Sequence, residues 1–239
     1  MKKIKIVKHL ITIILIIIIT FSLCFKEENK NKNGKRVLIL KRITEMDSNE
    51  ITIVNQAGNQ KIVDDNYLFV GDSITYRYDL NNYFKGLPTV NSGEEGNKTK
   101  DIINNIKERI YDYNPSKIFL LIGANQLEEN TTEEIFEDIK KIITLIRENR
   151  KYAYLFVESI YPVNSDINGP SKNKSNTKIM EINNELRNYY ENIEKVQYID
   201  IYSHLIDENG NLDIKYTEDG LHLNDNGYQE VTNVLKKYI

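Results

Sequence analysis

The 239-residue chain has no tryptophan and little cysteine, proline or histidine, with one, four and three residues respectively. Because Cys24 is the single cysteine, a disulfide within the chain and a cysteine-based zinc cluster are both excluded. Only His9, His204 and His222 offer an imidazole. Any chemistry that depends on histidine therefore has very few candidate residues.

Several familiar signatures are also missing. The formal net charge is -3 and no long basic stripe occurs in the body of the chain, so nucleic acid is not an expected partner. There is no Walker loop and no dinucleotide Gly-x-Gly-x-x-Gly motif. A Gly-x-Ser-x-Gly elbow is absent as well, which argues against an α/β-hydrolase.

A basic start and a long apolar run mark the N-terminus. Lys2, Lys3, Lys5 and Lys8 precede the apolar stretch Leu10–Phe25. This pattern is typical of a secretory signal or an uncleaved anchor. Since no small-x-small cleavage site follows, we expect residues 1–25 to form a membrane anchor, with the rest of the chain outside the cell. The alternative is secretion after cleavage.

Cys24 raises the question of lipid attachment. The residue before it is the bulky Leu23, where such sites need a small side chain, so an ordinary apolar cysteine in the span is favoured. Residues 26–66 are expected to form a polar tether with a short β-like extension, for which the sequence indicates no role.

The remaining chain, residues 67–239, alternates between apolar runs and amphipathic segments. Strands are expected at 67–70, 117–122, 152–157 and 196–201, and helices at 101–111, 131–146, 179–190 and 227–238. Strands that are apolar throughout need cover on both faces, which the helices supply. The pattern predicts a three-layer α/β/α sandwich with a parallel sheet, whose site lies at the carboxyl ends of the strands.

Ser73 follows the first of these strands at a glycine-led turn, Gly71-Asp-Ser. A serine hydroxyl becomes a strong nucleophile only when an adjacent base takes its proton. His222 is the preferred base, because Asp219 lies three residues before it and is able to hold the imidazole in one tautomer. Taken singly, each of these residues also fits a structural role, such as capping a helix.

Four stretches in this order resemble the SGNH or GDSL hydrolase superfamily. They are Phe69-Val-Gly-Asp-Ser-Ile-Thr75, Gly96-Asn-Lys-Thr99, Gly123-Ala-Asn125 and Asp219-Gly-Leu-His222. The resemblance, which covers the chain from about Tyr67 onward, implies a flavodoxin-like fold after the predicted membrane helix, and ester hydrolysis without a metal or cofactor. It implies Ser73, Asp219 and His222 as the catalytic triad, and Ser73, Gly96 and Asn125 as the oxyanion hole.

Two positions qualify this resemblance. Gln126 stands where the third block usually has an acid, and Gly93 is an alternative to Gly96 for the second block. The expected substrate is a short-acyl ester, such as an O-acetyl group on a cell-envelope carbohydrate. An O-acyltransferase, a lysophospholipase-like lipid esterase and a non-catalytic binding module remain as alternatives, and the sequence says nothing of oligomeric state.

Overall fold

The computed structural model describes residues 50–54, 60–190 and 193–239. The predicted membrane anchor, Cys24, His9 and most of the tether lie outside these residues. Within the described part, no helix combines the length and the apolar character that crossing a bilayer requires.

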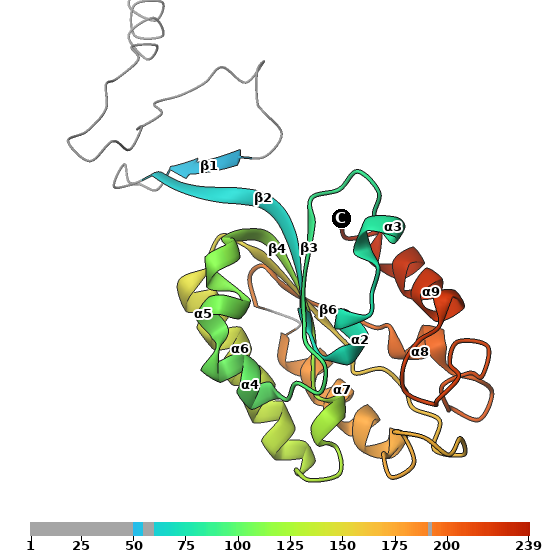
Figure 1. Ribbon diagram of the computed structural model, residues 1–239. Helices are drawn as coiled ribbons and strands as arrows, with labels where there is room; N and C mark the ends of the chain where they lie inside the picture. The colour runs from blue at the N-terminus through green and yellow to red at the C-terminus, as the bar shows by residue number, and fades with distance from the viewer. Residues whose placement is uncertain (1–49, 55–59, 191–192) are drawn as a thin grey trace, which may run out of the picture. The chain divides into compact units, whose positions relative to one another are not determined.

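A single sheet runs through this part of the chain (Figure 1). Its strands are β1 Glu50–Val54, β2 Gln60–Gly71, β3 Thr89–Gly93, β4 Pro115–Leu121, β5 Tyr154–Glu158 and β6 Val196–Ile199. β2 pairs in parallel with β3 and with β4, and β4, β5 and β6 continue in parallel. Among these described strands only β1 is antiparallel, to the first part of β2. The sequence prediction of a parallel sheet is confirmed.

The connections leave the first parallel strand, β2, in the interior of the sheet. The chain passes from β2 to β3 on one side, and then returns to β4 on the other. In doubly wound sheets such a reversal of direction opens a crevice at the carboxyl ends of the strands, where ligands bind. Whatever follows Gly71, the last residue of β2, is therefore placed at that crevice.

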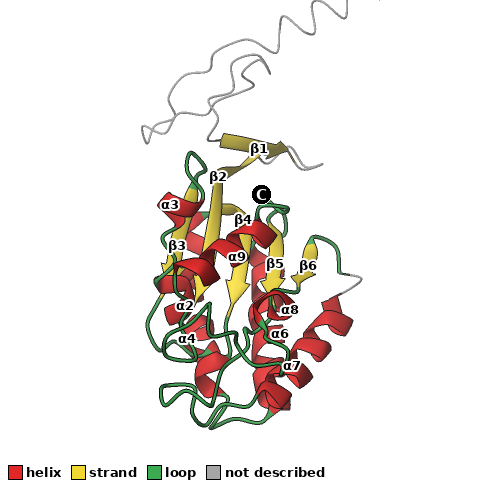
Figure 2. Cartoon of the chain, turned by 90° about the vertical axis from the view of Figure 1, so that its right-hand side faces the viewer, coloured by secondary structure: helices red, strands yellow, loops and turns green. Residues whose placement is uncertain are grey.

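Helices and short turns cover both faces of the sheet (Figures 1 and 2). They are α2 Ser73–Tyr76, α3 Leu80–Tyr83, α4 Thr99–Asn104, α5 Ile106–Arg109, η1 Tyr111–Tyr113, η2 Ala124–Gln126, α6 Thr132–Asn149, α7 Asn176–Tyr190, α8 Tyr202–Leu205 and α9 Asp225–Leu235. In Figure 1, α4, α5 and α6 lie on one side of the sheet, and α2, α8 and α9 on the other.

The two faces bury different side chains. The face under α4, α6 and α7 is mainly aliphatic, with Ile102, Ile139 and Ile179 among its fully buried members. The face under α2 and α9 is rich in aromatic rings, including Phe69 stacked on Phe119 at 4.6 Å between centroids. Offset stacking of rings on neighbouring strands stabilises the fold in addition to the burial of their apolar surface.

Three local predictions need correction. The helix expected over 101–111 is broken into α4, α5 and η1, because Asn105 leaves helical geometry with φ -116° and ψ 27°. β2 begins seven residues earlier than the apolar run at Tyr67 indicated, since its first part pairs with β1. β3 is too polar at Asn91 and Ser92 to be recognised from an apolar pattern.

Candidate active site

Ser73 is the first residue of α2 and directly follows the turn that ends β2. The carboxylate of Asp72 caps this helix by accepting the Ile74 N–H at 3.0 Å. Gly71 has no room for a side chain, because a Cβ there would lie 2.2 Å from Thr75 Oγ1 and 2.3 Å from Leu121 O. The glycine-led turn noted in the sequence thus has a packing reason.

The structure brings Ser73 and His222 together across 149 residues of sequence. Ser73 Oγ lies 3.0 Å from His222 Nε2, and His222 Nδ1 lies 2.6 Å from Asp219 Oδ2. Both are hydrogen-bond distances. The three predicted residues therefore form one continuous hydrogen-bonded row.

Asp219 is held on both carboxylate oxygens. Oδ2 faces the imidazole, while Oδ1 accepts the backbone N–H groups of Leu221 and His222 at 2.9 and 2.8 Å. Partial burial opposes ionisation, but the hydrogen bonds from His222 and from the backbone outweigh it and lower the pKa of Asp219 below its usual range. Asp219 is thus a carboxylate at neutral pH.

The loop that carries Asp219 and His222 is shaped by Gly220, whose φ is +80°. A Cβ at this position would also approach Asn164 O to 2.4 Å. The Asn164 N–H donates to Gly220 O at 2.8 Å, which ties the loop to the segment after β5. A glycine is needed here both for its backbone angle and for its small size.

The predicted oxyanion donors lie on two neighbouring loops. Asn125 is in η2, directly after β4, and its Nδ2 donates to Asn97 O at 3.1 Å. Because an amide nitrogen carries two hydrogens, this bond fixes the orientation of the amide and leaves a second N–H. Gly96 lies next to Asn97, with φ +72°. The two blocks therefore touch through Asn125 and Asn97.

Gly93 and Gly96 are distinguished by their surroundings. The N–H of Gly93 donates to Asn91 Oδ1 at 2.8 Å, and a Cβ on Gly93 would lie 2.2 Å from Tyr76 N. Gly93 thus serves close packing of β3 against α2. Nothing within 4 Å would meet a Cβ on Gly96. These contacts favour Gly96 over Gly93 as the donor.

His204 does not join this arrangement. It lies on α8, with Nδ1 3.3 Å from Glu230 Oε1. His222 is therefore the imidazole that the described residues place beside Ser73.

Arg109 is a supporting residue that the sequence analysis missed. Its side chain is 6% exposed and pairs with Glu94 at 3.0 Å. The guanidinium also donates to Gly71 O at 3.1 Å, to both oxygens of Ser92 and to Asn97 Oδ1. It thereby joins the strand that leads to Ser73 with the loop that carries Gly96. On one unbroken helix Arg109 would share the face of Ile102, seven residues earlier, but a charged residue at such a position is usually assigned to the solvent.

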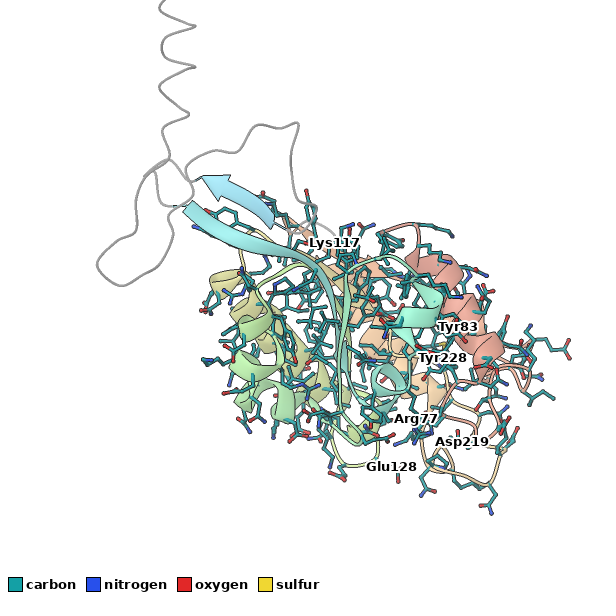
Figure 3. The ribbon with its side chains drawn as sticks, turned by 45° about the horizontal axis from the view of Figure 1, so that its top comes forward. Arg77, Tyr83, Lys117, Glu128, Asp219 and Tyr228 are labelled. Carbon is teal, nitrogen blue, oxygen red and sulfur yellow. The ribbon has the colours of Figure 1, made fainter. Side chains whose placement is uncertain are left out.

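Figure 3 shows the position of this site in the fold. Arg77, Glu128 and Asp219 gather near the lower edge, while Lys117, at the start of β4, marks the opposite end of the sheet. Arg77 pairs with Glu95 at 2.8 Å beside the site, and both side chains are more than two-fifths exposed. The row from Ser73 to Asp219 thus lies at the carboxyl ends of the strands, as predicted.

No cluster of three potential metal ligands occurs among residues 50–54, 60–190 and 193–239.

Comparison with protein families decides the relationship. Residues 69–230, which contain every predicted site residue, match the model of the GDSL-like lipase/acylhydrolase family. The chain belongs to this family. It is accordingly a hydrolase that acts on ester bonds, in agreement with the four blocks recognised in the sequence.

Relatives and solved structures agree with this assignment. The alpha2 subunits of platelet-activating factor acetylhydrolase IB from rat and human are each 27% identical over 177 residues, covering 72% of this chain and 75% of theirs. A Streptococcus pneumonia structure, described in terms of platelet activating factor, is 31% identical with a TM-score of 0.68, covering 73% of this chain and 83% of its own. The acetyl xylan esterase AlAXEase shares the fold, with 18% identity, a TM-score of 0.59 and coverage of 73% and 99%.

Proposed function

We propose that the protein is a serine esterase in which Ser73 attacks the ester, His222 moves the proton and Asp219 orients His222. The observation that carries this proposal is the hydrogen-bonded row from Ser73 Oγ through His222 to Asp219, at 3.0 and 2.6 Å. In such a row the carboxylate fixes Nδ1 as the protonated nitrogen, so that Nε2 is free to accept the serine proton.

The reaction proceeds in two halves. His222 Nε2 takes the proton of Ser73 Oγ as that oxygen bonds to the ester carbonyl carbon, and the carbonyl oxygen becomes negative. The N–H of Ser73, the N–H of Gly96 and Asn125 Nδ2 stabilise this charge. Protonated His222 then gives its proton to the departing alcohol, and water, activated in the same way, releases the acid and restores Ser73.

The proposed substrate is a short-acyl ester, in particular an acetyl ester of a carbohydrate. Two similar proteins support the acyl part, since the names of both refer to acetyl esters: the acetylhydrolase subunits and the acetyl xylan esterase. A carbohydrate is proposed as the alcohol because the predicted anchor places the enzyme at the cell envelope, and the xylan esterase that shares the fold is named for a carbohydrate ester.

A panel of esters tests both parts on the full chain. We expect the highest kcat/KM with acetyl esters among p-nitrophenyl esters of increasing chain length, and acetate release from acetylated oligosaccharides in preference to acetylated lipids. Ser73→Ala is the control and should abolish all turnover. A preference for long acyl chains would refute the substrate, and turnover by Ser73→Ala would refute the mechanism.

We also propose that residues 1–25 hold the enzyme at the outer side of the cell membrane. The proposal rests on the four lysines followed by the apolar run Leu10–Phe25. The full chain should remain in the membrane pellet after alkaline extraction, and external protease should remove the catalytic domain from intact cells. Recovery of a shortened, free protein in the medium would favour secretion instead.

A further inference from the structure

Gln126 occupies the position where the sequence departs from its family's third block. Its side chain is 2% exposed and uses both ends of its amide on one residue, Thr99. Oε1 accepts the Thr99 N–H at 2.9 Å, and Nε2 donates to Thr99 Oγ1 at 2.8 Å. Gln126 follows Asn125 directly, and Thr99 lies three residues after Gly96. The pair therefore ties together the two loops that carry the proposed oxyanion donors.

The first of these bonds satisfies an N–H at the start of a helix whose N-cap side chain makes no cap hydrogen bond. Thr99 is the first residue of α4, so its N–H has no partner within the helix. The residue at the N-cap is Lys98, whose side chain contains no acceptor. Gln126 Oε1 supplies the missing acceptor from another loop. The start of α4 is thereby fixed with respect to η2.

The second bond has a direction that the surroundings impose. Thr99 is fully buried, and its hydroxyl donates to Asp138 Oδ2 at 2.6 Å. Because a hydroxyl has one hydrogen, Thr99 Oγ1 is left only with lone pairs toward residue 126. The group at 126 must then be a donor, which an amide provides and a carboxylate does not.

We propose that Gln126 is a positioning residue that sets the spacing between the Gly96 N–H and Asn125 Nδ2 in the oxyanion hole. Its amide is part of a directed chain, from Gln126 Nε2 to Thr99 Oγ1 to Asp138 Oδ2. The proposal rests on the oxyanion hole described above and adds the means by which its two loops are kept in register. A displacement of donors by a fraction of an ångström weakens stabilisation of the transition state more than binding of the ester.

Gln126→Glu tests the positioning role of the amide, because the two side chains have almost the same shape. The carboxylate still accepts the Thr99 N–H, but its second oxygen faces the lone pairs of Thr99 Oγ1. We expect kcat to fall about 10- to 100-fold while KM changes by less than about twofold. The melting temperature, measured on the same samples, reports whether the fold is retained.

Asp138→Asn provides the rescue. In the double variant Gln126→Glu/Asp138→Asn, the amide introduced at position 138 donates to Thr99 Oγ1, and the hydroxyl turns to donate to the carboxylate introduced at position 126. The direction of the hydrogen-bonded chain is reversed, but each donor in it still has an acceptor. We expect kcat to return to within about threefold of the wild type, and Asp138→Asn alone to cost less than about threefold.

The outcomes separate this proposal from the proposed function. An unchanged kcat in Gln126→Glu, or a double variant no better than the single one, overturns the role of Gln126, while loss of turnover in Ser73→Ala still upholds the esterase mechanism. Turnover that persists in Ser73→Ala overturns the mechanism itself. A fall in melting temperature that accompanies the fall in kcat, with neither restored by Asp138→Asn, would show a merely structural role.

Discussion

The two halves of the proposed site belong to different layers of the molecule and are held by different contacts. Ser73 and His222 come from the aromatic face, from α2 and from the loop before α9. Gly96 and Asn125 come from loops next to α4 and α6, on the aliphatic face. In the first half the reacting side chains bond directly to one another. In the second, the donors depend on Gln126, Thr99 and Arg109, which have no proposed part in the reaction itself.

This contrast predicts how far each half tolerates change. The triad residues form the contacts that align them, so losing one removes both chemistry and geometry. Each oxyanion donor contributes its own hydrogen bond and is aligned by residues outside the reaction. Removing one donor should therefore lower the rate only in part. Substitutions in the two halves should therefore differ by orders of magnitude in rate.

The largest effect is expected for His222→Ala. Without the base, Ser73 keeps its proton, and kcat should fall about 10⁴- to 10⁶-fold in an assay with p-nitrophenyl acetate. His204→Ala is the matched control, because His204 pairs with Glu230 away from the triad, and it should remain near the wild-type rate. Comparable losses in both variants would contradict the assignment of the base.

A smaller loss is expected for Asn125→Ala. Removal of one of three donors should lower kcat about 10²- to 10³-fold and leave KM nearly unchanged. Asn233→Ala, on the exposed side of α9, serves as the control for an asparagine of no catalytic role. If KM rises while kcat is preserved, Asn125 binds the ester rather than the oxyanion.

Glu158→Gln tests the aromatic face of the sheet through its effect on the free energy of unfolding. Glu158 is buried and bonded to Tyr161 Oη at 2.5 Å, and burial raises its pKa from 4.5 to about 7. The folded protein thus binds this proton more tightly than the unfolded chain, so the stability it contributes is present below pH 4.5 and lost as the pH rises to about 7. The shift corresponds to about 3 kcal/mol in the free energy of unfolding.

Urea unfolding at pH 5 and pH 8 measures this contribution. The decrease in stability between the two values should be smaller in Glu158→Gln by up to about 3 kcal/mol. Glu208→Gln, at an exposed position, should follow the wild type. An identical pH dependence in wild type and Glu158→Gln would show that Glu158 is already ionised in the fold.

The smallest effect is expected for Arg77→Ala. The Arg77–Glu95 pair borders the triad but is exposed to solvent, and exposed pairs contribute about 0–1 kcal/mol. We expect kcat/KM to change by less than about threefold and to become less sensitive to salt. A loss above about tenfold would mean that Arg77 contacts the substrate.

Much of the fold and the centre of the site could be predicted from the sequence. Buried strands and their helices follow from apolar periodicity, as for α6 with its capping pair Thr131 and Glu134. Ser73, Asp219 and His222 stand out because their residue types and short spacings are distinctive. The hydrogen-bonded row between them depends on the fold as a whole, and no local pattern contains it.

The supporting residues could not be predicted, for reasons that are equally physical. β3 is half-buried and polar, so it lacks the apolar signal of its neighbours. Gln126 and Thr99 are partners only because two loops meet in space, although Gln126 was visible as a departure from the family's pattern. Arg109 was hidden because a charged residue on an apolar face is usually assigned to the solvent.

Covalent labelling tests the central claim most directly. The full chain should react with one equivalent of a fluorophosphonate, and mass spectrometry of the digested protein should locate the label on Ser73. Both Ser73→Ala and His222→Ala should remain unlabelled over the same period. Labelling of a different residue, or undiminished labelling of Ser73 in His222→Ala, would contradict the proposal that His222 activates Ser73.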